Sequence, residues 1–202
     1  VYNEYRMTVY CLRSLLDHLA DVPCQVIIAD DASTDLTASL QERIFGVTVE
    51  RAAENRGFLQ NCNAGAELAT GDYILFLNND TAFTPGWLSA LIDVFEQDSQ
   101  AGIAGPMLLY GNGRLQEAGG IVWDDASGWN YGRMDDPSRP EYCYRREADY
   151  VSGACLLIRA GLWRELGGFD ERYVPAYYED TDLCFAARAA GYKVVYQPHS
   201  RI

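Results

Sequence analysis

The segment Gly71-Asp72-Tyr73-Ile74-Leu75-Phe76-Leu77-Asn78-Asn79-Asp80 holds the clearest strand pattern of the sequence. Its five apolar and aromatic residues, 73–77, predict a buried β-strand, and the polar residues that follow end it. A cation such as Mg²⁺ or Mn²⁺ takes hard oxygen ligands, often one or two carboxylates together with substrate phosphates. Asp80, which follows two amides at a strand end, is therefore a candidate metal ligand. A polar turn without a ligand explains the same residues equally well.

Helical and strand patterns alternate on both sides of this segment. Strands that alternate with helices of about a dozen residues form right-handed β-α-β crossovers, which predict an α/β fold with a mostly parallel sheet and flanking helices. In such sheets ligands bind beyond the carboxyl ends of the strands, where Asp30-Asp31 and Asn78-Asn79-Asp80 both lie. Apolar spacing predicts helices over 6–20, 35–45, 58–69 and 86–97, and strands over 24–29, 46–49 and 73–77.

The second half of the chain has a different composition. Its first part, 102–133, is rich in Gly, Trp and Tyr and predicts hairpins and loops, and 134–146 predicts an exposed loop. No repeat and no low-complexity linker appears, so the sequence predicts one domain, 1–202, with two unequal halves. Strands are expected over 151–158 and 193–196, and helices over 160–166 and 179–190.

The composition excludes several classes of protein. Acidic residues number 29 and basic residues 16, which gives a formal net charge of −13 and a field that repels nucleic acid and anionic headgroups. No apolar stretch approaches the roughly 20 residues that span a bilayer, and no secretory signal is visible. The six cysteines form no C-x-x-C pair and are expected to be free, mostly buried thiols in a reducing cytosol.

A second acidic cluster, Asp30-Asp31, follows the strand predicted over 24–29. Asp and Ser favour turns and helix N-caps, and Ser33, Thr34 and Asp35 are the candidate caps for the next helix. A carboxylate at a strand end also accepts hydrogen bonds from a ligand N–H, such as the imide of a nucleobase. The two interpretations are compatible, because Asp35 can cap the helix while Asp31 binds a ligand.

A third acidic cluster, Glu179-Asp180-Thr181-Asp182, begins the last predicted helix directly after two tyrosines. Acidic residues in a first turn interact favourably with the helix dipole, by about 0.3–1 kcal/mol each. That structural role alone accounts for two of the three carboxylates. A carboxylate at a helix start, in an aromatic-walled pocket, is also suited to act as a general base.

Eight segments in chain order resemble the family-2 glycosyltransferases with the GT-A fold, and most closely their rhamnosyltransferase-like branch. The resemblance covers nearly the whole chain and implies a Rossmann-like sheet whose first strand, which precedes Val1 in the family, is truncated. It also assigns 1–100 to nucleotide binding and 101–202 to acceptor binding and catalysis. The matching segments are 1–4, 26–35, 54–58, Asn63 with Gly65, 71–80, 151–154, 167–171, and 179–184 with 190–192.

The resemblance implies roles for individual residues. Asp80 would ligate Mg²⁺ or Mn²⁺ on the donor diphosphate, and Asn78 stands where many members carry the first Asp of D-x-D. Asp180 would act as the catalytic base, with Glu179 in support. The residues implied in nucleotide binding are Tyr2, Asn3, Glu4, Asp31, Arg56, Asn63 and Asn79, and those implied beside the donor sugar and acceptor are Ser152, Gly153, Ala154 and Asp170.

The implied activity is that of an inverting glycosyltransferase that moves one sugar from a nucleoside-diphosphate sugar to an acceptor hydroxyl. The expected acceptor is a glycan or a lipid-linked glycan in cell-surface polysaccharide synthesis, and no nucleic-acid partner is expected. The Gln-x-x-Arg-Trp motif of processive synthases is absent from the sequence, which favours transfer of a single sugar. A cytoplasmic location is expected. Any attachment to the inner face of the membrane would come from residues outside this chain.

Two other functions compete with this one. A sugar nucleotidyltransferase has a similar fold but needs a Gly-rich, basic triphosphate loop near the N-terminus, which this sequence lacks. A non-catalytic carbohydrate-binding domain would stack sugars on exposed aromatic rings, for which the candidates are Trp123, Trp129, Tyr131 and Tyr144.

Overall fold

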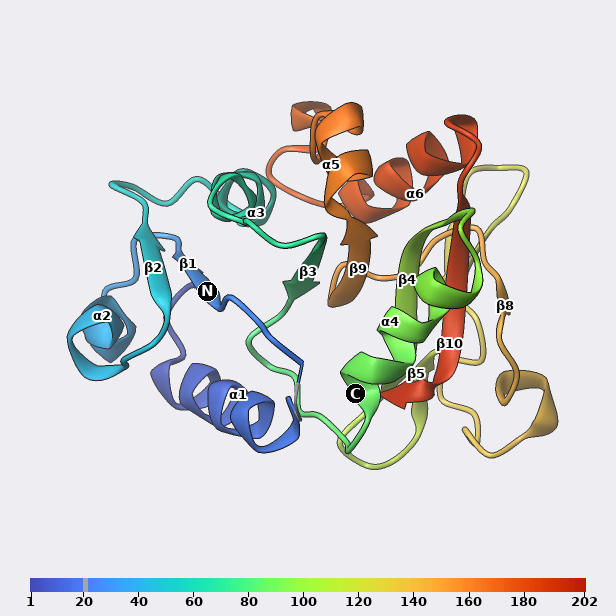
Figure 1. Cartoon of the computed structure of the whole chain (residues 1–202), viewed down its shortest axis with the longest axis horizontal. Helices are drawn as coiled ribbons and strands as arrows, with labels where there is room; N and C mark the ends of the chain where they lie inside the picture. The colour runs from blue at the N-terminus through green and yellow to red at the C-terminus, as the bar shows by residue number, and fades with distance from the viewer. Residues whose placement is uncertain (20–21) are drawn as a thin grey trace.

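Two main sheets organise the fold (Figure 1). The computed structural model of the chain describes residues 1–19 and 22–202. The smaller sheet pairs β1 (Ile27–Asp30) with β2 (Thr48–Arg51) in parallel. The larger sheet runs in the order β3-β9-β4-β10-β8, with β5 added on β4. Its strands are β3 (Tyr73–Leu77), β4 (Ala101–Leu109), β5 (Leu115–Glu117), β8 (Arg146–Glu147), β9 (Cys155–Arg159) and β10 (Lys193–Arg201).

Strand β9 makes the larger sheet mixed. Strands β4 and β10 run parallel, as the alternating pattern predicts, but β9 lies between β3 and β4 and is antiparallel to both. Strands β5 and β8 also pair antiparallel with their neighbours. The predicted α/β class is confirmed, while among the described strands parallel pairing is confined to β1–β2 and β4–β10.

Helices cover both sheets. Helix α3 contacts β1, α4 contacts β4 and β10, and α5 contacts β3 and β9. Residues 35–45, predicted as one helix, form a 3₁₀ turn over Leu36–Ser39 that continues into a short α-helix, α2. The predicted helix over 6–20 ends at His18, and its residue 20 lies outside the described residues. The helices are α1 (Tyr5–His18), α2 (Leu40–Arg43), α3 (Phe58–Glu67), α4 (Trp87–Gln97), α5 (Ala160–Leu166) and α6 (Glu179–Ala189).

Strand β4 departs from the prediction of hairpins and loops over 102–133. It is a long buried strand that contributes Ile103 and Met107 to one hydrophobic cluster and Ala104 and Leu108 to another. Gly105 is required here for packing, because a Cβ at this position would lie 2.5 Å from the Cβ of Val151. The predicted hairpin does occur further on, where β6 (Gly120–Val122) pairs with β7 (Gly128–Asn130).

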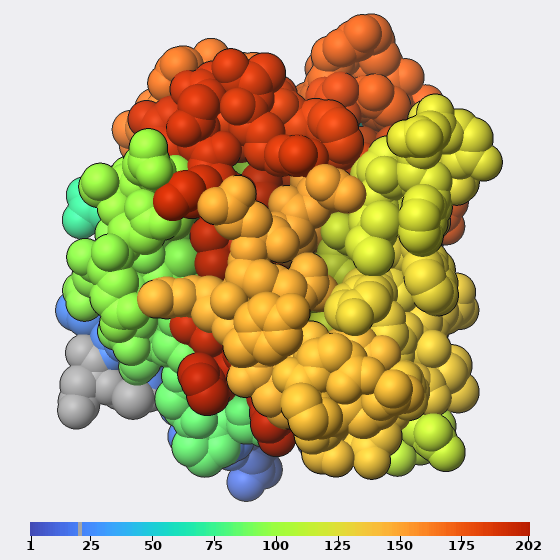
Figure 2. All heavy atoms as spheres, turned by 90° about the vertical axis from the view of Figure 1, so that its right-hand side faces the viewer, coloured from blue at the N-terminus to red at the C-terminus, as the bar shows by residue number. Residues whose placement is uncertain are grey.

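The segment between β4 and β9 forms a large part of the face in Figure 2, where it appears in yellow and orange beside green and red residues. It includes 134–146, which was predicted as an exposed loop but contains a 3₁₀ turn, Pro140–Tyr142, with the ring of Tyr142 buried. All six cysteines are free, as expected, and Cys24 and Cys143 are exposed. In the part of the chain that the structure describes, no helix has the length and apolar character needed to cross a membrane.

A cavity of about 1020 Å³ separates the two sheets. Its walls include Ile27 and Ala29 of β1, Leu75 and Leu77 of β3, and Leu15 of α1. Strand β1 pairs only with β2, and β3 only with β9, among the described strands. The carboxyl ends of β1 and β3 therefore face the same space.

Candidate functional site

Five of the residues expected at the nucleotide site line this cavity. Tyr2 and Glu4 come from the N-terminal segment, Asp31 from the end of β1, and Asn79 and Asp80 from the end of β3. The fold therefore brings the strand-end polar clusters together, as expected for ligand sites in α/β sheets.

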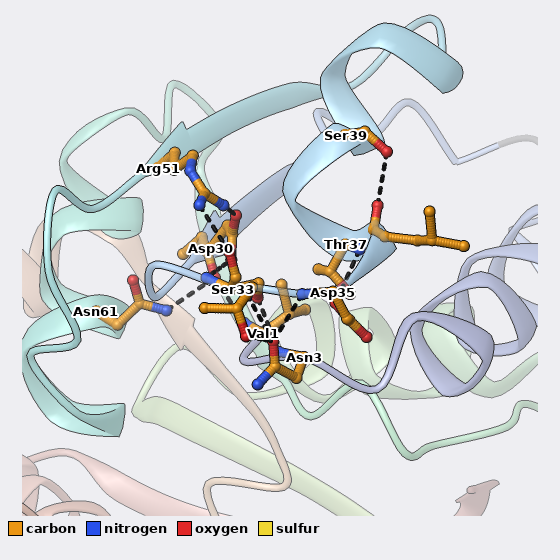
Figure 3. Close-up of polar contacts among 12 residues, drawn as sticks. Val1, Asn3, Asp30, Ser33, Asp35, Thr37, Ser39, Arg51 and Asn61 are labelled. Atoms are coloured by element: carbon orange, nitrogen blue, oxygen red, sulfur yellow. Dashed lines mark hydrogen bonds and ion pairs between the residues drawn. The ribbon is translucent and has the colours of Figure 1, made fainter.

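Hydrogen bonds fix the N-terminal segment to the loop after β1 (Figure 3). Asn3 Oδ1 accepts the N–H of Thr34 at 2.7 Å and of Asp35 at 3.2 Å, and the Asn3 N–H donates to Ser33 Oγ at 2.7 Å. Asp35 accepts the N–H of Thr37 at 2.9 Å, so its predicted role as a helix N-cap is confirmed. The Asn3 side chain thus orders the loop that carries the first acidic cluster.

The two carboxylates of that cluster have different surroundings. Asp30 is buried and forms an ion pair with Arg51. Asp31 is also buried, and its Oδ1 and Oδ2 accept the backbone N–H groups of Arg56 at 2.8 Å and Gly57 at 3.0 Å. A carboxylate has about four acceptor positions, so two at Asp31 are left for a ligand N–H.

Arg56 and Asn79, both expected to hold the nucleotide, are also bound within the chain. Arg56 Nη2 pairs with Glu50 Oε2 at 2.6 Å. Asn79 Nδ2 donates to Thr8 Oγ1 at 2.9 Å, which leaves its side-chain carbonyl and its second N–H able to meet a ribose hydroxyl.

Asp80 is suited to hold a divalent cation together with a ligand. It is exposed, lines the cavity, and forms no hydrogen bond or ion pair with another described residue, so its carboxylate oxygens are available. The described residues contain no cluster of three or more His, Cys, Asp or Glu side chains that would hold a metal unaided. One carboxylate with substrate phosphate oxygens is the coordination typical of Mg²⁺ sites, so the residues present fit a metal that binds with the nucleotide.

Asn63, another expected nucleotide-binding residue, links α3 to the turn after α5. Its Oδ1 accepts the N–H of Phe169 at 3.0 Å, and its Nδ2 donates to the carbonyl of the same residue at 2.9 Å. Gly168 passes close by, since a Cβ there would lie 3.0 Å from Asn63 Oδ1.

Replacing Asn63 with Ala should lower the free energy of unfolding by about 2 kcal/mol, because two hydrogen bonds of about 1 kcal/mol each are lost. Urea denaturation measures this change. The control is Asn55→Ala, at an exposed position without a side-chain hydrogen bond among the described residues. A loss no larger than in the control contradicts the linking role. Nucleotide titration of the folded variant tests the separate role in nucleotide binding.

Asp180 lies at the start of α6 with three donors on its carboxylate. Oδ2 accepts the N–H of Gly153 at 2.8 Å, and Oδ1 accepts the N–H of Thr181 at 2.6 Å and its hydroxyl at 3.2 Å. The neighbouring Glu179 is buried, and burial raises the pKa of its carboxyl above the ordinary value. Two adjacent carboxyl groups thus have different environments, which is a pattern typical of acid–base sites.

A backbone hydrogen bond joins the end of β3 to the segment that contacts Asp180. The N–H of Asn78, at the end of β3, donates to the carbonyl of Ala154 at 3.0 Å. Ala154 directly follows Gly153, whose N–H holds Asp180, and its own N–H donates to Ser152 Oγ at 3.2 Å. The residues expected from 78–80, 152–154 and 179–180 are therefore assembled at one place.

Asp170 has a different setting. It caps the 3₁₀ turn Glu171–Tyr173 by accepting the N–H of Arg172 at 2.9 Å, and it forms an ion pair with the same guanidinium at 2.6 Å. Any contact with the donor sugar would have to form beside this ion pair.

Glu117 is a residue of the site that the sequence analysis missed. It lies on β5 with 1% of its surface exposed, and its Oε1 accepts the N–H of Ser152 at 3.0 Å. The alternation in β5 gives a signal, because Glu117 shares the buried face of its strand with Leu115. Charged residues are rarely fully buried without a partner, so a Glu at a buried strand position indicates a special role.

Comparisons with known proteins identify the family and the fold of the chain. The sequence model described as "Glycosyl transferase family 2" matches residues 1–166. An N-acetylglucosaminyl-diphospho-decaprenol L-rhamnosyltransferase of Mycobacterium tuberculosis is 28% identical over 89% of this chain and 66% of its own length. The chain thus spans just under two thirds of that relative.

Solved structures show the same fold. A structure of GalNAc-T7 with UDP, GalNAc and Mn²⁺ has a TM-score of 0.82 at 18% identity, covering 100% of this chain and 41% of that one. The mannosyltransferase PcManGT of Pyrobaculum calidifontis, in complex with GDP-Man and Mn²⁺, has a TM-score of 0.72 at 18% identity, covering 100% of this chain and 53% of that one. The predicted GT-A fold is confirmed, and with the match over 1–166 the chain belongs to glycosyl transferase family 2.

Proposed function

We propose that the chain carries the nucleotide-binding and catalytic residues of an inverting glycosyltransferase. The observation that carries the proposal is the assembly of Asp80, on a cavity-lining strand end, with Asp180, through the bond between Asn78 and Ala154. A nucleoside-diphosphate sugar needs a site for its base, a charge partner for its diphosphate and a base for the incoming hydroxyl. In this proposal the cavity receives the base, Asp80 holds a cation that offsets the charge of the diphosphate, and Asp180 takes the proton of the hydroxyl.

Asp180 takes the proton from the acceptor hydroxyl in this proposal. The hydroxyl oxygen attacks the anomeric carbon as the bond to the nucleoside diphosphate breaks, so the sugar inverts its configuration. The hydrogen bonds from Gly153 and Thr181 fix the orientation of the carboxylate, which is what general-base catalysis requires. Glu179, buried beside it, supports the start of α6.

A divalent cation held by Asp80, Mg²⁺ or Mn²⁺, would neutralise charge on the departing diphosphate as a Lewis acid. The Mn²⁺ in the structures of GalNAc-T7 and PcManGT supports a divalent metal for this fold. The net charge of −13 makes such a cation important, because few basic residues are available to offset the phosphates.

Asp80→Asn should remove the part of nucleotide binding that depends on metal. Binding to the native state raises the unfolding temperature, so UDP or GDP with Mn²⁺ should stabilise the unchanged protein more than the nucleotide alone. In Asp80→Asn the two shifts should become equal. Asp93→Asn, an exposed position on α4, is the control and should keep the difference. A full Mn²⁺-dependent shift in Asp80→Asn rules Asp80 out as the ligand.

The acceptor is proposed to be a glycan or a lipid-linked glycan at the cytoplasmic face of a membrane. The name of the Mycobacterium tuberculosis relative, which contains a diphospho-decaprenol group, supports a lipid-linked acceptor. The donor base and sugar follow from the same thermal-shift screen, run with UDP-, GDP- and dTDP-linked sugars.

One observation also favours a carbohydrate-binding function. Trp123 and Trp129 on the β6–β7 hairpin are about half exposed and stack with ring centroids 6.4 Å apart. The hairpin is tied to the catalytic helix, because the Gly128 N–H donates to the hydroxyl of Tyr178 at 3.4 Å. Calorimetry that shows sugar binding without nucleotide or metal would favour a non-catalytic role. Binding that requires both favours an acceptor subsite of the transferase.

A further inference from the structure

Glu117 is a buried acid with one carboxyl oxygen that accepts a hydrogen bond and one that has no hydrogen-bond partner among the described residues. Its Oε1 accepts the N–H of Ser152 at 3.0 Å. Its Oε2 is buried and has no hydrogen-bond partner among the described residues. No Lys or Arg forms an ion pair with it in the described chain, and 1% of the residue is exposed. An isolated buried carboxylate is costly, so this environment favours the neutral acid.

Two consecutive peptide N–H groups connect Glu117 to Asp180. The N–H of Ser152 donates to Glu117, and the N–H of the next residue, Gly153, donates to Asp180 Oδ2 at 2.8 Å. Residues 152–153 are therefore held from both sides, by the carboxyl groups of Glu117 and Asp180. Gly153 also approaches Asp180 closely, since a Cβ at this position would lie 3.5 Å from the Asp180 Cβ. A shift of the Ser152 peptide would move the donor that orients Asp180.

The other ionisable groups near Glu117 do not neutralise its charge. Tyr150, Cys184 and Tyr196 lie close enough for its charge to raise their pKa values further. Arg146 donates to the carbonyl of Ala118 and stacks on aromatic rings. Burial, with a smaller effect of the Asp180 charge, raises the pKa of Glu117 to about 8.

We propose that Glu117 is a positioning residue for the transfer reaction, a neutral carboxyl that holds the Ser152 peptide so that Gly153 keeps Asp180 in its reactive orientation. This inference rests on the proposed function of Asp180 as the base. A neutral acid is suited to the position because it accepts the Ser152 N–H without placing a second negative charge beside Asp180 and the departing diphosphate. Ionisation of Glu117 would add that charge and slow turnover.

The test compares Glu117→Leu, which removes the acceptor, with Glu117→Gln, which keeps a neutral acceptor of the same shape. Glu117→Leu should lower kcat for release of nucleoside diphosphate roughly tenfold or more, with KM for the donor little changed. Glu117→Gln should restore the turnover that Glu117→Leu loses. The matched control is Gln116→Leu, on the same strand with its side chain on the opposite face. Equal losses in Glu117→Leu and Glu117→Gln, or none in either, overturn the proposal.

The pH profile separates positioning from a merely structural role. In the unchanged protein kcat should fall above pH 8, and Glu117→Gln should lack this fall.

Carbon-13 NMR of glutamate carboxyl groups gives a readout that does not depend on turnover. One resonance should titrate near pH 8 and be missing from Glu117→Gln, and a spectrum in which every glutamate titrates below pH 6 overturns the proposal. If that resonance is present but no donor sugar is turned over, the proposed function fails and the neutral state of Glu117 stands.

Discussion

Replacing Asp180 with Asn is expected to lower kcat for sugar transfer by about two to four orders of magnitude, the usual contribution of a general base. The amide cannot accept the proton of the acceptor hydroxyl. Its one side-chain oxygen can still accept the N–H of Gly153, while the NH₂ group that replaces Oδ1 cannot accept the N–H of Thr181. Donor binding should be preserved, because the residues expected to hold the nucleotide are unchanged. Steady-state release of nucleoside diphosphate measures the first effect, and titration calorimetry with the donor measures the second.

Asp182→Asn provides the matched control for this experiment. Asp182 lies on the same turn of α6, and its Oδ1 accepts the hydroxyl of Tyr173 at 3.1 Å, a bond that an amide oxygen also accepts. The control should therefore retain normal kcat. If Asp180→Asn retains full turnover as well, the base lies elsewhere, and Glu179→Gln becomes the variant to measure.

Glu117→Gln is expected to stabilise the protein at neutral pH by up to about 3 kcal/mol, because one pKa unit corresponds to about 1.4 kcal/mol. Burial raises the pKa of Glu117 from 4.5 to about 8, so between these values the folded chain keeps a proton that the unfolded chain releases. The contribution of this proton to stability is complete below pH 4.5 and is lost as the pH rises to about 8. Glutamine has no proton to lose and avoids this decline.

Urea denaturation at pH 5 and at pH 8 measures the difference between Glu117→Gln and the unchanged protein. The gain in unfolding free energy should be small at pH 5 and largest at pH 8. Glu67→Gln, at an exposed position on α3, controls for the removal of one negative charge from an acidic protein. A gain that is the same at both pH values would show that Glu117 is not protonated in the folded state.

Much of the first half of the chain, residues 1–100, could be predicted from the sequence. Strand β3 has the predicted bounds, and Asp35 forms the predicted cap, because local periodicity and side-chain capping determine both. Residues at the ends of β3 and β1 also line one cavity, which follows from the general geometry of α/β sheets. In the second half, helix α5 also matches its predicted range.

The second half was harder to predict because distant packing decides it. The glycines of β4 indicated turns, whereas Gly105 provides room for Val151, a residue far away in the chain. Strand β9 inserts between β3 and β4, which no local pattern specifies. Glu117 was missed for the same reason, because its importance comes from a hydrogen bond to Ser152 across 35 positions.

The hydrogen bond between Asn78 and Ala154 has an evolutionary consequence, because it joins two backbone groups and uses no side chain. Every residue except proline supplies the required N–H at position 78. Asn or Asp can therefore occupy this position without altering the link between the end of β3 and the segment that holds Asp180. A change of side chain at position 78 therefore leaves intact the backbone link that sets the end of β3 beside the segment in contact with Asp180.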